Sequence, residues 1–193
     1  IVLPGSKATL ADMAALRAQG WDRQIIAHAK RGGRVIGICG GYQMLGRRIA
    51  DPLCIEGSDA EIDGLGLLDV ETVMAPEKRL ANSTARSLSY DVALSGYEIH
   101  LGSTSGADCA RPYVEIEGRA DGATSSDGRI AGTYLHRLFD SDGFRKGLLA
   151  EFGISGGAVN YRQTVEDALD ELAGELEELL AREWLDRILD QAR

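Results

Sequence analysis

The sequence VIGICGGYQMLG at residues 35–46 sets a cysteine between a short apolar run and a segment with helical spacing. The apolar run predicts a buried strand, and the segment after Cys39 predicts a helix. A strand, a sharp turn that carries a nucleophile, and a helix together form a nucleophile elbow, here Gly37-x-Cys39-x-Gly41. The two glycines fit this interpretation because side chains at their positions would collide with the neighbouring strand and helix.

The elbow gives Cys39 a candidate chemical role. Its sulfur is expected at the N-terminus of the following helix, where partial positive charge favours a thiolate over a thiol. A thiolate there is a candidate nucleophile. The segment by itself leaves a second interpretation open, in which Cys39 is a buried structural cysteine in a glycine-rich turn.

The residues around the elbow predict an α/β fold. The expected elements are a strand at residues 1–3, a helix ending at Gly20, a helix over 21–30, a strand over 34–38 and a helix over 41–49. This order is typical of a mostly parallel sheet flanked by helices. Ser6 or Thr9 is expected to cap the first helix.

The remainder of the chain changes character after residue 50. Helical periodicity is absent from residues 51–133, and turn signals such as Ser126-Asp127-Gly128 separate short extended runs, so we expect an antiparallel insertion. The runs lie at residues 67–74, 88–94, 97–101, 113–116 and 130–135. A helix is expected over 140–152. An apolar stripe over 161–192 predicts a C-terminal helix that either docks on the domain or binds a partner.

Composition excludes some classes of partner. The chain has 193 residues and a net charge of −9, which argues against nucleic acid or an anionic membrane as the main partner. No apolar run is long enough for a transmembrane helix. The three cysteines, at positions 39, 54 and 109, have no C-x-x-C spacing, so we expect neither a metal site nor a disulfide framework, and a cytoplasmic location.

A cysteine nucleophile needs a base, and the chain has three histidines. His136 ends the run GTYLH at residues 132–136, where a strand gives way to a loop. Because reactive groups in open α/β sheets gather at the C-terminal ends of the strands, Cys39 and His136 are expected to meet there. His100 is the alternative base or a substrate contact, and His28 is expected on the surface of a helix.

Three segments together carry a family resemblance. They are residues 37–46, the sequence GYEIHLG at residues 96–102, and GTYLH at residues 132–136. In this order and spacing they resemble the class I (triad-type) glutamine amidotransferase domain of the cobyric acid synthase family. The resemblance implies a flavodoxin-like fold over residues 1–193. The chain begins inside the apolar run IVLPG, so we expect that the N-terminal edge of this domain precedes residue 1.

The resemblance also implies a reaction. The Cys39 thiolate attacks the side-chain amide of glutamine and releases ammonia, with His136 as the base. The backbone N–H groups of Gly40 and Gly5 are the expected oxyanion donors. Class I amidotransferases generally carry a glutamate two residues after the histidine, where this chain has Leu138. The group that orients His136 is therefore left open between a backbone carbonyl, Asp140 and a water.

Further residues are implied for the glutamine pocket. Gln43, Glu98 and His100 are expected to line it, and Arg79 or Lys78 to meet the substrate carboxylate. No metal and no cofactor are expected in this domain. The resemblance also implies that ATP and Mg²⁺ bind a separate synthetase domain upstream. This chain itself has no phosphate-binding Gly-x-x-x-x-Gly-Lys-Ser/Thr loop.

The expected function is to supply ammonia for the ATP-dependent amidation of adenosylcobyrinic acid a,c-diamide in cobalamin biosynthesis. The expected partners are L-glutamine and the synthetase domain. One alternative is the amidotransferase subunit of the complex that amidates lipid II in the cell wall. A cysteine peptidase with the same elbow is a second alternative, and a catalytically silent binding domain is a third.

Overall fold

The computed structural model describes residues 1–57, 59–76, 79–155, 160–179, 184 and 188–189, without the side chains of residues 79 and 80. The chain forms two compact units, residues 1–144 and residues 145–193. The candidate site lies within the first unit. No helix in these described ranges is both long and apolar enough to cross a membrane.

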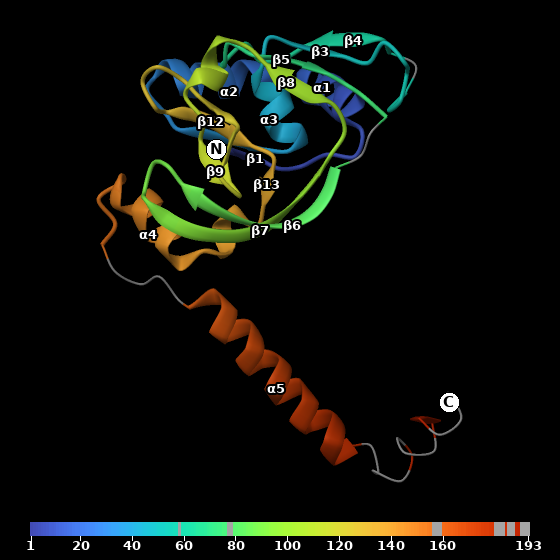
Figure 1. Cartoon of the computed structure of the whole chain (residues 1–193), viewed down its shortest axis with the longest axis vertical. Coiled ribbons are helices and arrows are strands. Elements are labelled where there is room, and N and C mark those ends of the chain that lie inside the picture. Colours follow the sequence, from blue (N-terminus) through green and yellow to red (C-terminus); the bar gives the residue numbers. More distant parts are fainter. Residues whose placement is uncertain (58, 77–78, 156–159, 180–183, 185–187, 190–193) are drawn as a thin grey trace. The chain divides into compact units, whose positions relative to one another are not determined.

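A small, mainly parallel sheet carries the elbow (Figure 1). Its strands, in spatial order, are β1 (Val2–Leu3), β2 (Val35–Ile38), β12 (Ile130–Thr133) and β11 (Ala123–Thr124). The first three are parallel, and β11 is antiparallel to β12. The turn predicted at residues 126–128 lies between β11 and β12, with Gly128 at φ 75°. This sheet confirms the parallel arrangement predicted around residues 35–38.

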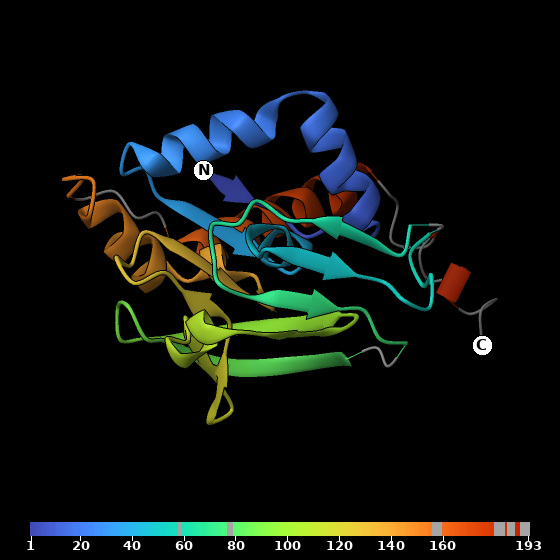
Figure 2. The same ribbon diagram turned by 90° about the horizontal axis from the view of Figure 1, so that it is seen from above.

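Two helices connect β1 to β2, as predicted. They are α1 (Thr9–Ala18) and α2 (Trp21–Lys30). Figure 2 shows them on one side of β1 and β2, with the long hairpin of β6 (Arg79–Ser87) and β7 (Val92–His100) on the other. The predicted cap of α1 is wrong, because the N-cap residue is Ala8 and has no side-chain cap. The Ser6 hydroxyl instead accepts the Ala8 N–H, and the Thr9 N–H donates to the Glu56 carboxylate at 2.5 Å.

The helix after the elbow is shorter than predicted. It is α3 (Gly40–Leu45), and it ends because Gly46 has an extended backbone. Residues 48–50 form a strand, β3, in place of the last helical turn. This strand belongs to a second sheet with the order β4 (Glu61–Asp63), β3 (Arg48–Ala50), β5 (Glu71–Val73) and β8 (Ser103–Ser105).

The predicted antiparallel insertion is confirmed as a five-stranded sheet. Its order is β10 (Arg119–Asp121), β9 (Val114–Ile116), β6 (Arg79–Ser87), β7 (Val92–His100) and β13 (Leu135–His136). The runs predicted at 88–94 and 97–101 are largely one strand, β7. Strand β6 escaped prediction because its sequence, RLANSTARS, lacks apolar alternation. Strand β13 pairs with β7, so the chain returns from β12 to the antiparallel sheet just before His136.

The remaining helices are short 3-10 turns and two α-helices. The turns are Ala107–Ala110 and Leu138–Asp140, and the helices are α4 (Asp142–Ala150) and α5 (Tyr161–Leu179). The part of the predicted 161–192 helix beyond residue 179 lies almost wholly outside the described residues. The core of the first unit packs α1 and α3 against the sheets, with Met13, Val35, Leu45, Ile49 and Val70 fully buried.

Candidate active site

The elbow at Cys39 has the geometry that the sequence predicts. Cys39 has φ 54° and ψ −115°, a backbone conformation that is strained for a residue with a side chain. Its N–H donates to the carbonyl of Thr133 at 2.9 Å, which ties the turn to the end of β12. A Cβ on Gly41 would lie 2.1 Å from the Leu3 carbonyl oxygen, and one on Gly37 would lie 2.6 Å from the Gly41 oxygen. Only glycine fits at these two positions.

Cys39 and His136 meet at the turn that follows β1. A Cβ built on Gly5 would lie 3.5 Å from Cβ of Cys39 and 3.0 Å from Cε1 of His136. The predicted pair therefore shares one small space beneath Gly5. His28 lies elsewhere, at the end of α2, where its Nε2 is 3.2 Å from the Arg34 carbonyl.

The backbone carbonyl of Ile99 contacts both members of the pair. The Cys39 thiol donates to it at 3.2 Å, and the same carbonyl forms a hydrogen bond with the His136 imidazole. The Tyr97 ring stacks on the His136 imidazole, with the ring centroids 4.7 Å apart and the planes 5° apart. Asp140, another candidate orienter, instead accepts a hydrogen bond from Arg137 at 2.6 Å. Of the two protein groups considered, the backbone carbonyl is the one in contact with the imidazole.

The pKa shifts of the two groups both favour their neutral forms. Burial raises the pKa of the Cys39 thiol; a hydrogen bond from the Gly40 N–H opposes this shift and the charge of Glu56 adds to it. Burial lowers the pKa of His136, and the Ile99 carbonyl only partly offsets this. Desolvation of the charged sulfur therefore opposes the effect of the helix N-terminus, which the sequence predicts to favour a thiolate. Nε2 of His136 is buried with no hydrogen-bond partner among the described residues, which leaves it able to accept a proton.

Gln43 lies one helical turn after Cys39, and both atoms of its amide group form hydrogen bonds within the chain. Its Nε2 donates to the Leu101 carbonyl at 3.0 Å and to the Tyr134 hydroxyl at 3.2 Å. Its Oε1 accepts a hydrogen bond from the Thr9 hydroxyl at 3.2 Å. These bonds fix the direction of the amide.

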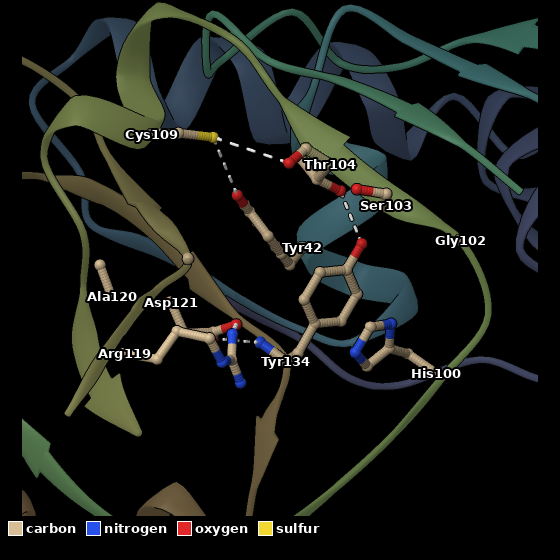
Figure 3. A pocket seen from close by; sticks show the side chains of 11 residues that line it. Tyr42, His100, Gly102, Ser103, Thr104, Cys109, Arg119, Ala120, Asp121 and Tyr134 are labelled. Carbon is tan, nitrogen blue, oxygen red and sulfur yellow. Dashed lines mark hydrogen bonds and ion pairs between the residues drawn. The ribbon is translucent and has the colours of Figure 1, made fainter. Parts of the chain in front are cut away.

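His100 lines a separate pocket of about 230 Å³, and so does Arg119, the partner of Glu98 (Figure 3). The fully buried Glu98 carboxylate accepts a hydrogen bond from Arg119 at 2.7 Å. The His100 ring stacks on Tyr134 at 3.7 Å, and the Tyr134 hydroxyl lies 2.6 Å from that of Thr104. Figure 3 shows these rings and Thr104 around the pocket. Tyr134 thus stands between this pocket and Gln43.

The two predicted contacts of the substrate carboxylate are side chains that the structure does not describe. Arg79 opens β6 and pairs with His100 in register, but its side chain is not among those described. Lys78 is outside the described residues. Among the residues that are described, no group of three or more histidine, cysteine, aspartate or glutamate side chains is arranged to hold a metal ion.

Several residues of the site gave no signal in the sequence. Tyr97 and the Ile99 carbonyl lie inside the quoted segment 96–102, where strand alternation was the only available indication of their direction. Arg119 and Glu56 lie in loops or short strands without periodicity, so only the tertiary structure identifies them.

Comparison with known proteins decides the family. Residues 1–144 match the family of CobB/CobQ-like glutamine amidotransferase domains. The chain belongs to this family. Within it, the cobyric acid synthases of Allorhizobium ampelinum and Rhizobium meliloti are 62% and 65% identical to this amidotransferase chain over 189 residues, 98% of its length. The chain spans 39% of the length of each relative. The resemblance to the cobyric acid synthase family is confirmed.

Solved structures support the fold of this amidotransferase domain. A crystal structure of a glutamine amidotransferase aligns with a TM-score of 0.56 at 12% identity, covering 79% of this chain and 78% of the other. The structure of PurLQS from Thermotoga maritima aligns with a TM-score of 0.50 at 16% identity, covering 68% of each chain. At such identities the likeness concerns the fold alone, and it confirms the predicted class I amidotransferase fold.

Proposed function

We propose that this chain hydrolyses glutamine through Cys39 and His136 and passes the ammonia to an ATP-dependent amidation. The proposal rests on one observation: the side chains of Cys39 and His136 lie together beneath Gly5, and the thiol donates a hydrogen bond to the Ile99 carbonyl. A nucleophile and a base in one buried space are what acyl transfer from an amide requires.

The proposed mechanism begins from the neutral pair. As glutamine binds, Nε2 of His136 takes the thiol proton, and the sulfur attacks the side-chain amide carbon. The oxyanion that forms accepts hydrogen bonds from the N–H of Gly40, which already points at the sulfur, and from the Gly5 turn. His136 then gives the proton to the departing ammonia. Water hydrolyses the thioester with His136 again as base, and glutamate leaves.

The proposed glutamine pocket includes Gln43, Glu98, His100 and Arg79. The bonds of Gln43 to Thr9 and Tyr134 support a role in holding the wall of the site. The pairing of Glu98 with Arg119 neutralises its charge and supports the same role. Arg79 remains the proposed contact of the substrate carboxylate.

The proposed acceptor of ammonia follows from the relatives. They are named cobyric acid synthases, and this chain spans 39% of their length, so the rest of such a protein has room for a synthetase domain. We propose that the ammonia amidates adenosylcobyrinic acid a,c-diamide in cobalamin biosynthesis, with ATP and Mg²⁺ bound outside residues 1–193. The lipid II complex is the second candidate, and stimulation of glutamine hydrolysis by the corrinoid substrate separates the two.

An apolar groove of about 740 Å³ beside β1 supports the proposed N-terminal edge of the domain. Ile1, Leu16 and Trp21 line it, and Trp21 is 58% exposed. We propose that residues preceding this sequence in the full-length protein cover the groove. Acrylamide quenching of Trp21, in a Trp184→Phe background, is expected to weaken when those residues are present; equal quenching contradicts the proposal.

A glutamine-like electrophile tests the function directly. A diazoketone analogue of glutamine is expected to label Cys39 in the wild-type chain, with the adduct located by mass spectrometry. Cys39→Ser removes the label, and His136→Ala slows it. Labelling of Cys54 or Cys109 instead, or of no cysteine, contradicts the proposed dyad and favours a silent binding domain.

A further inference from the structure

A polar pocket of about 410 Å³ lies on the β6–β7 hairpin, next to the candidate base. Strands β6 and β7 supply most of its lining, and two residues outside the hairpin complete it. The described residues that line it are Asn82, Ser83, Thr84, Ser95, Gly96, Tyr97, Glu117 and Arg137. The mechanism proposed above makes no use of this pocket.

Tyr97 connects the pocket to His136. Its ring stacks on the His136 imidazole with 4.7 Å between the ring centroids, and the same residue lines the pocket. The two residues are also direct partners in the pairing of β13 with β7. In the proposed mechanism, Nε2 of His136 is the atom that gives a proton to the departing nitrogen. The newly formed ammonia is therefore separated from the pocket by one aromatic side chain.

The register of the hairpin gives the pocket a direction relative to the substrate. Arg79, the proposed contact of the substrate carboxylate, pairs with the last residue of β7. One residue earlier in β7 lies Ile99, whose carbonyl contacts Cys39. Tyr97 precedes it by two residues and Ser95 by four, which is roughly 13 Å at a strand rise of about 3.3 Å per residue. The carboxylate end of glutamine, its reacting amide and the pocket thus follow one another along β7.

The lining of the pocket suits ammonia. Three exposed side chains at this face carry amide or hydroxyl groups, those of Asn82, Thr84 and Ser95. Such groups form hydrogen bonds without exchanging their charge near neutral pH, so ammonia in contact with them stays neutral. Ammonia must be neutral to attack an activated carboxylate, because an ammonium ion has no lone pair.

We propose that ammonia leaves the active site past Tyr97 through this pocket, and that the ammonia-consuming domain docks over the pocket. The inference rests on the proposed function. As the carbon–nitrogen bond of the substrate amide breaks, His136 supplies the third hydrogen, so the product is neutral ammonia beside Tyr97. The pocket lies on the exposed face of the hairpin, where a docked domain would shield this ammonia from protonation in solvent.

The other cavities described above suit this role less well. The pocket of about 230 Å³ lies beyond Tyr134 and is lined by Asp121, whose carboxylate favours the ammonium ion over ammonia. The groove of about 740 Å³ beside β1 is mainly apolar and offers ammonia few hydrogen bonds. The remaining interpretation of the polar pocket is an entrance for glutamine.

Ser95→Trp tests the exit by filling the pocket. Ala93→Trp is the matched control, because Ala93 is exposed on the same face of β7, two residues away, and does not line the pocket. Both variants are made in the full-length protein. Each is supplied with ATP, the corrinoid acceptor and glutamine that carries a heavy nitrogen isotope in its side-chain amide, in an excess of unlabelled ammonium chloride. Mass spectrometry of the amidated product gives the labelled share.

The wild-type protein and Ala93→Trp are expected to place mainly labelled nitrogen in the product. Ser95→Trp is expected to hydrolyse glutamine near the wild-type rate and to lower the labelled share several-fold. Amidation with ammonium chloride alone is expected to be unchanged, which shows that the variant is folded. Thr84→Trp, which fills the pocket from β6, is a second variant with the same expected result.

Three results overturn the exit while glutamine hydrolysis, and with it the proposed function, stands. The first is a labelled share that is unchanged in both filled variants. The second is unlabelled product from the wild-type protein, because the ammonia then passes through solution. The third is a raised KM for glutamine with an unchanged labelled share, which identifies the pocket as the entrance. If the wild-type protein neither hydrolyses glutamine nor forms the amide, the proposed function itself fails.

Discussion

The Cys39 thiol donates a hydrogen bond to the backbone carbonyl of Ile99 at 3.2 Å. The same carbonyl interacts with His136, so one atom of β7 (Val92–His100) contacts both the nucleophile and the base. The imidazole therefore has a hydrogen-bond partner without a carboxylate. This agrees with the presence of Leu138 where related enzymes place a glutamate. Because the contact is made by the main chain, substitution of the Ile99 side chain leaves the carbonyl in place.

The pH dependence of glutamine hydrolysis follows from the neutral pair. Burial lowers the pKa of His136 below its ordinary value of 6.5, and the imidazole must be neutral to accept the thiol proton. The value of kcat/KM is therefore expected to rise with pH along a limb centred below 6.5. It then stays level until the pH approaches the raised pKa of Cys39, above 9.0. A limb centred above pH 6.5 contradicts the assignment.

Gly5→Ala tests the shared space beneath the β1 turn. The added methyl group lies 3.0 Å from Cε1 of His136, so the imidazole must move away from the thiol. We expect kcat/KM to fall about 100-fold with a small change in thermal stability. Gly57→Ala is the control, because nothing lies within 4 Å of a Cβ at that position. If the two variants are equally active, the reaction does not take place in the space that Cys39 and His136 share beneath Gly5.

Tyr97 positions the base by stacking. The ring of Tyr97 is parallel to that of His136 at 4.7 Å, and such a contact contributes about 1 kcal/mol. Tyr97→Leu is expected to lower kcat several-fold, up to about tenfold, and Tyr97→Phe to restore it. Steady-state kinetics of both variants provide the measurement. If Tyr97→Phe is as impaired as Tyr97→Leu, the hydroxyl and not the stacked ring is responsible.

Asp121 holds the strand end that carries the base. Its buried carboxylate accepts hydrogen bonds from the Thr133 hydroxyl at 2.6 Å and from the Tyr134 N–H at 3.0 Å. Asp121→Ala leaves two buried donors without an acceptor and is expected to lower the free energy of unfolding by about 3 kcal/mol. Urea titration measures this change. The exposed Asp127, changed to alanine, is expected to cost less than about 1 kcal/mol, and similar losses for the two variants rule out the proposed role of Asp121.

Much of the fold could be predicted because its signals are local. Helices α1 (Thr9–Ala18) and α2 (Trp21–Lys30) follow from apolar spacing and terminal glycines, and the elbow follows from Gly37 and Gly41 around Cys39. Strand β6 (Arg79–Ser87) could not be predicted, because its stability comes from pairing with β7 rather than from its own composition. The end of α3 at Leu45 was missed for the same reason, since residues 48–50 are strand through their pairing with β4 and β5.

The sequence alone determined the family and predicted Cys39 and His136 as the reacting pair, because the steric needs of the elbow and the motif around His136 are written in consecutive residues. The tertiary structure alone decided which groups form hydrogen bonds with Cys39 and His136 and in which direction their pKa values shift. Ile99 reaches Cys39 across 60 positions of the chain, and Glu56 reaches Thr9 across 47. Burial, which raises the pKa of Cys39 and lowers the pKa of His136, depends on everything packed around them and therefore exists only in the folded chain.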